Sequence, residues 1–317
     1  MKGIVSLSTL IAVVGGYVVK TKEDFEYSPQ LQDYLSKRHY KRLYDDLNAT
    51  SKRVFDYDNE KVYGVNLGGW VVTEPYISPS LYWNASTDGT EATVPIDEYH
   101  YCKTLGTEEC YTRLKDHWDT WIVEDDFKKI KSWGFNTVRF PIGYWAFAHL
   151  STDPYCFGQE EYLEKAIEWC RNQGLYIWID LHGVPGSQNG FDNSGLRDHV
   201  NWQHHQAYID LSLEILQYIM AKYGGNEYED VVSAIQVLNE PLGPRLNMNQ
   251  LEEFYLNSYT QMKYLKNDIS LAYHDAFMAP GYWDSRMTGK VSHTTNLTLY
   301  PNTGNLTGYT NSSNYQG

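Results

Sequence analysis

The chain has 317 residues, of which 42% are hydrophobic, and carries a formal net charge of −14 at pH 7. This length allows one large or two ordinary domains, and the hydrophobic content is typical of a globular protein. The acidic balance and the lack of a long basic run argue against nucleic acid and anionic membranes as partners. The 28 Tyr and 10 Trp favour a carbohydrate partner, although most of them are expected in the core.

The N-terminus has the pattern of a secretory signal. Met1 and Lys2 precede a short apolar stretch rich in small residues, which is too short for a convincing membrane-spanning helix. We therefore expect a signal peptide over residues 1–19 and no membrane attachment after its removal, with a signal-anchor as the alternative. Residues 20–53 are polar and hold three dibasic pairs, the last at Lys52 and Arg53, so a pro-segment that ends at Arg53 is expected.

Glycosylation sequons and cysteines agree with a secreted, extracellular or cell-wall product. Four cysteines allow up to two disulfides in that compartment, in three connectivities that spacing does not separate. None of them has a zinc-site spacing, and no phosphate-binding Gly-rich loop follows a strand, so no metal or cofactor is expected. The Asn-X-Ser/Thr sequons are Asn48, Asn84, Asn296, Asn305 and Asn311.

From residue 60 onward, predicted strands alternate with amphipathic helices, as in βαβ units. In chain order we expect strands over residues 62–67, 136–141, 175–181, 231–238 and 269–274. The helices are expected over residues 125–133, 159–172, 201–223 and 249–267. An insertion over residues 73–121 separates the first strand from its helix and should lie on the rim side.

This alternation fits a doubly wound sheet as well as a β/α barrel. Polar residues that recur just past the strand ends favour the barrel, because a barrel rim assembles its site from many strands. Five units extend to about residue 275, and too few residues remain for three more. We therefore expect an α/β fold of the (β/α)8 TIM-barrel type over residues 54–290, incomplete at about five βα units. An irregular Asn/Thr-rich tail is expected over residues 291–317.

The predicted fourth strand leads directly to a candidate catalytic residue. Its apolar run requires cover on both faces, as in a buried parallel strand, and Pro241 ends it. Asn239 and Glu240 would then lie at the carboxyl end of the strand, on the catalytic rim of a barrel. A carboxyl there is a candidate general acid for glycoside hydrolysis, which normally uses a second carboxylate opposite the first.

Four motifs carry a resemblance to a known family: residues 62–70, 136–145, 180–189 and 239–241. In this succession they closely resemble the fungal exo-1,3-β-glucanases of glycoside hydrolase family 5, over about residues 55–290. The resemblance implies a retaining enzyme that releases glucose from the non-reducing end of cell-wall β-1,3-glucan. We expect this enzyme to be a monomer. Lys52 and Arg53 also resemble the maturation site of the secreted yeast enzymes.

The resemblance implies roles for residues that follow the strands. Glu240 matches the acid/base, and Asn239 would hydrogen-bond the sugar 2-hydroxyl. Arg139 would orient and polarise the nucleophile, and His182 matches a sugar-contacting histidine. The alternatives are a structural glutamate at a strand end, an asparagine that forms a turn, a buried ion pair and a core histidine.

A second group of implied roles lies on loops. Glu74 matches a residue that binds hydroxyls of the non-reducing end, a contact that helps to make such enzymes exo-acting. Phe191 and Phe277 resemble aromatics that hold the next glucose at the pocket mouth, and Asn193 resembles a polar contact beside them. The alternative for all four is that they are ordinary loop residues.

The sequence departs from the family pattern after residue 284. The family continues to a seventh strand that carries the nucleophilic glutamate, whereas Asp284 is the last acidic residue here. We therefore expect the nucleophile-bearing strand to be absent from this chain, and the chain to be poorly stable and inactive. Two alternatives to a glucosidase remain: a non-catalytic glucan-binding wall glycoprotein and a truncated inactive product.

Overall fold

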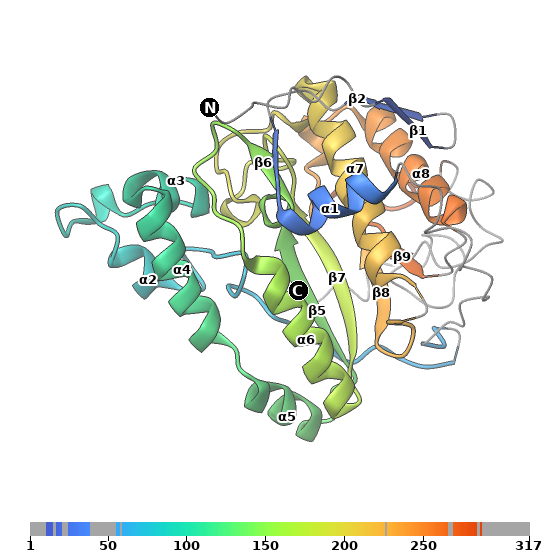
Figure 1. Ribbon diagram of the computed structural model, residues 1–317, viewed down its shortest axis with the longest axis horizontal. Helices are drawn as coiled ribbons and strands as arrows, with labels where there is room; N and C mark the ends of the chain where they lie inside the picture. The colour runs from blue at the N-terminus through green and yellow to red at the C-terminus, as the bar shows by residue number, and fades with distance from the viewer. Residues whose placement is uncertain are drawn as a thin grey trace, which may run out of the picture.

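The computed structural model describes residues 11–14, 17–20, 25–38, 55–57, 59–225, 227–265, 269–283 and 286. Its centre is a five-stranded parallel sheet with the strand order β4-β5-β7-β8-β9 (Figure 1). The strands are β4 (Gly64–Asn66), β5 (Thr137–Gly143), β7 (Tyr176–Gly183), β8 (Val232–Gln236) and β9 (Ser270–Ala272). All five predicted strands are therefore confirmed, with shorter bounds for the first, fourth and fifth.

The strand order decides between the two α/β architectures. Along the chain from β4 to β9, each strand of this sheet pairs with the next strand of the same sheet, and every pairing is parallel. A doubly wound sheet reverses its strand order at a switch point, whereas a barrel adds strands in one direction. The described sheet is therefore part of a barrel, and β4 and β9 are its two edge strands.

Four helices connect these strands: α5 (Glu124–Ser132), α6 (Gln159–Gln173), α7 (Gln206–Tyr223) and α8 (Met248–Tyr264). The predicted helix over residues 201–223 starts too early, because residues 202–204 form a separate 3-10 turn. There, the backbone N–H groups of Asn201 and Trp202 donate to the carbonyl groups of Gly186 and Ser187. These tertiary hydrogen bonds hold the segment outside the helix.

A small cluster of buried side chains fills the inside of the sheet at the amino end. Phe55 and Tyr57 pack there against Trp178, Ala234 and Ala272. The Tyr57 hydroxyl accepts a hydrogen bond from the Trp178 indole at 2.9 Å and donates to the carbonyl of Ser233 at 3.2 Å. The carboxyl end of the sheet is left for the polar residues that follow the strands.

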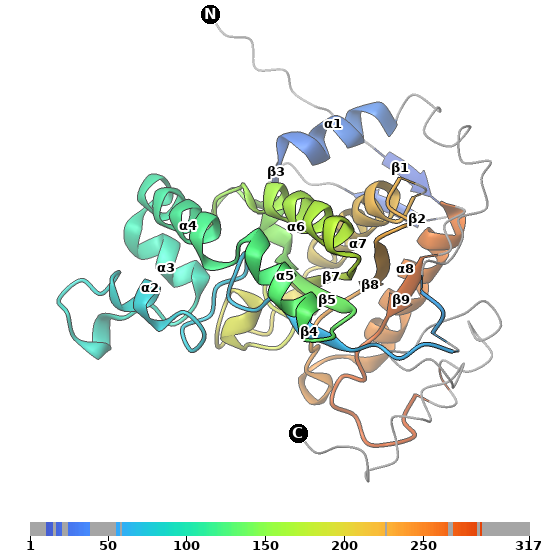
Figure 2. The ribbon, with the colours of Figure 1, turned by 90° about the horizontal axis from the view of Figure 1, so that it is seen from below.

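The predicted insertion folds into three helices, α2 (Pro79–Trp83), α3 (Glu98–Leu105) and α4 (Thr107–Trp121). They form a group at one side of the molecule, away from β8 and β9 (Figures 1 and 2). A disulfide between Cys102 and Cys110 joins α3 to α4, whereas Cys156 and Cys170 are free and buried. Of the two disulfides that four cysteines allow, one is formed.

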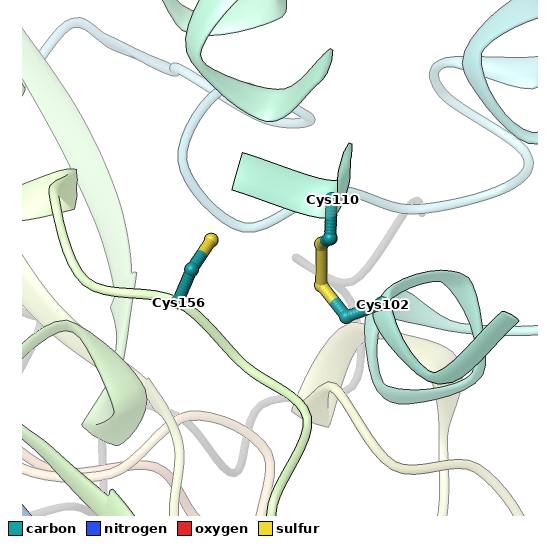
Figure 3. A group of neighbouring side chains, drawn as sticks. All are labelled: Cys102, Cys110 and Cys156. Atoms are coloured by element: carbon teal, nitrogen blue, oxygen red, sulfur yellow. A yellow bond between two sulfur atoms is a disulfide. The ribbon is translucent and has the colours of Figure 1, made fainter. Parts of the chain in front are cut away.

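The free thiol of Cys156 lies beside this disulfide (Figure 3). The Sγ atoms of Cys102, Cys110 and Cys156 all lie within 4.8 Å of one another, and all three side chains are buried. Cys156 comes from the loop before α6, so the three sulfur atoms gather at the contact between the insertion and the sheet-bearing part of the chain.

Two elements lie within residues 20–53, the expected pro-segment. Strand β3 (Phe25–Tyr27) pairs antiparallel with β6 (Ala148–Leu150), and helix α1 (Pro29–Arg38) lies on the same side as α7 (Figure 2). Leu31 is fully buried, and Tyr27 donates a hydrogen bond to Glu214 of α7 at 3.3 Å. Local pattern did not indicate this packing, because it depends on partners more than 100 residues away.

The predictions about the two ends of the chain fall partly outside the described residues. Strand β1 (Ile11–Val14) lies in the expected signal peptide and pairs antiparallel with β2 (Tyr17–Lys20), which ends at the first residue of the expected pro-segment. The dibasic pair Lys52–Arg53 and the tail over residues 291–317 lie outside the described residues. Within the described ranges, no helix is long and apolar enough to cross a membrane.

Candidate active site

The guanidinium of Arg139, on β5, joins residues from four strands at the carboxyl end of the sheet. It donates to the side-chain oxygens of Asn66 at 2.8 Å, Gln236 at 2.9 Å and Asn239 at 2.8 Å. It also forms an ion pair with Asp180 at 2.8 Å. Each of its three nitrogens therefore donates to a side chain from β4, β7, β8 or the loop after β8, and this connects the strand ends.

Asp180, on β7, connects this arginine to His182. Its carboxylate is fully buried and accepts a hydrogen bond from Nδ1 of His182. This bond assigns the Nδ1 proton and leaves Nε2 as an acceptor, which lies 3.4 Å from the side-chain nitrogen of Asn239. Sequence analysis missed Asp180, although a charged residue in an otherwise apolar buried strand was a signal for it.

Asn239 and Glu240 follow β8 by three and four residues, so the strand ends earlier than expected. The backbone N–H of Asn239 donates to Leu181, and its carbonyl accepts from the side chain of Gln188. Glu240 has a left-handed backbone with φ 43°, which costs a non-glycine residue about 1–3 kcal/mol. The side-chain amide of Asn193 donates to the Glu240 carboxylate at 2.8 Å.

Glu74 approaches this group from the start of the insertion. Burial raises the pKa of its carboxyl, and the charges of Asp192 and Glu240 raise it further, against the opposing charges of His182 and Arg139. Charges act on each other in this way only at short range. These effects indicate that Glu74 lies near Glu240 and His182, although it is far from both in the sequence.

Two aromatic rings from different loops lie at the mouth of the site. Phe191 and Phe277 form an edge-to-face pair with centroids 6.5 Å apart, and they are 38% and 46% exposed. Asp275, just after β9, accepts a hydrogen bond from the backbone of Phe277 at 2.9 Å and so shapes this turn. Rings that stay this exposed beside buried polar groups are suited to contact a bound molecule.

A pocket of about 520 Å³ opens beside these rings. Asn193, which holds Glu240, is one of its lining residues, so the pocket and the carboxyl group are neighbours. Burial raises the pKa of Asp192, another lining residue that sequence analysis did not select. Tyr76, Phe191, Arg197 and Arg245 also line the pocket.

The structure thus gathers the predicted residues into one site. Hydrogen bonds and an ion pair with Asp180 join Arg139, His182 and Asn239. Glu240, next to Asn239 in the chain, is held separately by Asn193. His274 is a further member that was missed: burial lowers its pKa, although Asp275 and Glu240 act in the opposite direction. A carboxyl group, an imidazole and amides that lie next to a pocket and an exposed aromatic pair can bind a sugar and protonate its leaving oxygen.

Comparison with known proteins agrees with this arrangement. Residues 82–275 match the family model described as Cellulase (glycosyl hydrolase family 5). A protein named glucan 1,3-beta-glucosidase from Candida oleophila is 52% identical over 239 residues, which are 74% of this chain and 56% of that protein. One of the same name from Lachancea kluyveri is 51% identical over 247 residues, 76% of this chain and 55% of that protein.

The chain therefore spans about half the length of the curated relatives it matches. The crystal structure of rutinosidase from Aspergillus niger superposes with a TM-score of 0.64 at 24% identity, over 73% of this chain and 67% of that one. That likeness concerns the fold, and it confirms a barrel of which this chain covers a part. With the match over residues 82–275, the chain belongs to glycosyl hydrolase family 5.

Proposed function

We propose that this chain provides the acid/base carboxyl and most of the sugar-binding wall of a retaining glucan 1,3-β-glucosidase that acts on cell-wall β-1,3-glucan. The observation that carries the proposal is the hydrogen bond from Asn193 to Glu240, at the end of a strand whose other polar residues meet at Arg139. The names of the relatives at about 50% identity support the same activity.

In this proposal Glu240 donates its proton to the glycosidic oxygen while the bond from that oxygen to the anomeric carbon breaks. The resulting carboxylate then takes a proton from the water that releases the sugar. Asn193 keeps the carboxyl oriented before the substrate binds, because its amide donates to Oε2. Retaining hydrolysis also needs a nucleophilic carboxylate about 5–5.5 Å away. That role is assigned to no residue in the described part of the chain.

Asn239 and His182 form the wall that would receive the glucose at the non-reducing end. Asp180 holds His182 in the tautomer with a free Nε2, and Arg139 occupies Oδ1 of Asn239, so the Asn239 amide group faces the imidazole and the sugar. Glu74 would bind hydroxyls at the closed end of the site. Phe191 and Phe277 would stack on the next glucose at the mouth.

We further propose that the product is a secreted, glycosylated monomer, with a signal peptide over residues 1–19 and a pro-segment over residues 20–53. Asn84, at the end of α2, is exposed and therefore accessible to a glycosyltransferase, while the other four sequons lie outside the described residues. The Cys102–Cys110 disulfide supports an oxidising compartment.

A non-catalytic glucan-binding wall protein is the second candidate. It is favoured by one observation: the polar wall and the aromatic pair are present, whereas no described carboxyl is assigned as the nucleophile. The two candidates share the binding site and differ only in turnover.

The test is glucose release from laminarin by the purified chain, together with the binding of laminaritriose by calorimetry. Release that is lost in Glu240→Gln supports the glucosidase. Binding without release, by this chain and also by a chain extended with the C-terminal part of a glucosidase relative, supports the wall protein. A folded chain that neither binds nor hydrolyses would refute both, and circular dichroism establishes that the variant is folded.

A further inference from the structure

Glu98, the first residue of α3 in the insertion, is a fully buried carboxylate with three hydrogen-bond donors. Its Oε2 accepts from the backbone N–H of Thr73 at 2.8 Å and from the Thr73 hydroxyl at 2.9 Å. Its Oε1 accepts from the indole N–H of Trp145 at 2.8 Å. Because the side chain has no exposed surface, it does not touch a ligand in the site.

The hydrogen bonds from Thr73 to Glu98 position Glu74. Thr73 is its immediate neighbour in the chain, and both the N–H and the hydroxyl of Thr73 are fixed by Glu98. The hydroxyl of Tyr82 lies 2.8 Å from the Thr73 hydroxyl and 3.1 Å from its carbonyl, so the Thr73 peptide is held on both sides. The direction in which Glu74 leaves the backbone therefore depends on Glu98.

The hydrogen bond from the indole to Glu98 positions Trp145, whose ring lies directly against three glycines. A Cβ atom would come within 2.4 Å of this ring at Gly143, 2.8 Å at Gly183 and 2.6 Å at Gly195. Gly183 directly follows His182, and Gly195 ends the turn that begins just before Asn193. The indole, which also stacks on Tyr155 at 4.7 Å, thus supports the backbone that presents both site residues.

We propose that Glu98 is a positioning residue through which the insertion sets the geometry of the sugar site. It fixes the peptide before Glu74 and, through Trp145, the backbones of His182 and Asn193, without contacting the ligand itself. The assignment of β-1,3-linked glucose as that ligand rests on the function proposed above.

Burial and neighbouring charges make the site sensitive to the replacement of Glu98. Burial raises its pKa to about 7, while the hydrogen bonds from Thr73 and Trp145 oppose the shift and the neighbouring charge of Asp97 adds to it. Tyr82, Tyr101, Tyr155 and Cys156 also face this charge. A buried carboxylate is costly unless donors surround it. Glu98→Gln keeps the volume but turns an N–H2 group toward donors.

The test is a double-mutant cycle with Glu74, read as the dissociation constant for laminaritriose by calorimetry. We expect Glu98→Gln to weaken binding at least about fivefold, the size of one typical lost hydrogen bond. In a Glu74→Ala background, the factor by which Glu98→Gln weakens laminaritriose binding should be at least about two times smaller. Glu98 can then no longer act through Glu74. Equal losses in the two backgrounds, or an unchanged affinity in Glu98→Gln, would overturn the proposal.

Glu160→Gln is the matched control, because Glu160 is also a buried carboxylate with three donors. It accepts hydrogen bonds from Tyr218 at 2.6 Å, Tyr223 at 2.8 Å and Lys222 at 3.0 Å, between α6 and α7. We expect it to lower stability and to leave the affinity for laminaritriose unchanged. If it weakens binding as much as Glu98→Gln does, the effect of Glu98 is general destabilisation and the proposal fails.

A ligand-independent readout separates this proposal from the proposed function. In NMR spectra, Glu98→Gln should shift the indole N–H resonance of Trp145 and accelerate hydrogen exchange at the Thr73 amide by about tenfold or more. Unchanged values at both protons would overturn the positioning role. A wild-type chain that binds no laminaritriose would instead refute the proposed function and leave these two readouts to decide the role of Glu98.

Discussion

The side-chain amide of Asn193 donates a 2.8 Å hydrogen bond to the carboxylate of Glu240, which itself has a left-handed backbone. The two residues belong to different loops, one after β7 and one after β8. The bond joins the carboxyl group to a residue that lines the pocket. An unfavourable backbone at this position is maintained by contacts around it, as is common for residues that act on a substrate.

Removal of this bond should weaken ligand binding without unfolding the chain. Asn193→Ala leaves Oε2 of Glu240 without its donor, so we expect laminaritriose to bind about fivefold more weakly. Calorimetry at pH 6 measures the change. The control is Asn59→Ala, since Asn59 makes a comparable bond to Asp56 on the exposed surface. Equal affinities of Asn193→Ala and the wild type would contradict the orienting role.

Asp180 should matter for stability as well as for the site. Asp180→Asn removes the buried partner of Arg139 and His182, and the loss of one member of a buried ion pair typically costs about 3–5 kcal/mol. We expect a lower urea midpoint and a loss of laminaritriose binding.

The matched control is Asp230→Asn, because Asp230 pairs with Arg171 at 2.6 Å on the surface. An exposed pair contributes about 0–1 kcal/mol, so its urea midpoint should hardly change. If both variants lower the urea midpoint by a similar amount, the ion pair between Asp180 and Arg139 stabilises the chain no more than an exposed ion pair does.

Stability should fall as the pH rises, because of Glu98. Its pKa is raised from 4.5 when unfolded to about 7 when folded. Between these values the folded state retains a proton that the unfolded state has lost, so each rise in pH favours unfolding. The contribution is complete below pH 4.5 and disappears by about pH 7, with a total of about 3 kcal/mol.

Urea unfolding at pH 5 and pH 7.5 measures this effect as the difference between wild type and Glu98→Gln. Other raised carboxyls, such as Asp153 and Asp192, contribute to both proteins and cancel in the difference. We expect a smaller loss of stability with pH in Glu98→Gln. Parallel pH profiles for the two proteins would contradict the assignment of this titration to Glu98.

The cysteines should show a defined pattern of reactivity. Peptide mapping without reduction should recover the Cys102–Cys110 linkage. Burial raises the pKa of Cys156 to about 12, so its thiol should react with iodoacetamide only after unfolding. Since the three sulfur atoms lie within 4.8 Å, Cys110→Ser should allow Cys102 to pair with Cys156. A variant that keeps both thiols free after oxidation would contradict this proximity.

The N-terminal segment should contribute to stability. Leu31 is fully buried on α1, and replacement of a buried leucine by alanine costs about 2–5 kcal/mol. Leu31→Ala should therefore lower the thermal midpoint by several degrees, as measured by circular dichroism. Lys37→Ala, at an exposed position of the same helix, should not. Identical midpoints for Leu31→Ala and the wild type would show that residues 25–38 do not pack on α7.

The sequence by itself determined the family, the five parallel strands and the position of Glu240. These follow from local information: apolar runs of strand length, helices that end at glycines such as Gly174, and four motifs in a fixed succession. The grouping of Arg139, His182 and Asn239 was also predictable, because residues at the carboxyl ends of parallel strands meet at one rim.

Only the tertiary structure decided which charged residues are buried and what they hold. The sequence gives no sign that Glu98 reaches Thr73 and Trp145, or that residues 25–38 lie on α7. It also left open whether Phe191 and Phe277 meet. The physical reason is that a buried carboxylate or an edge-to-face ring pair depends on partners far away in the chain, and local periodicity carries no information about them.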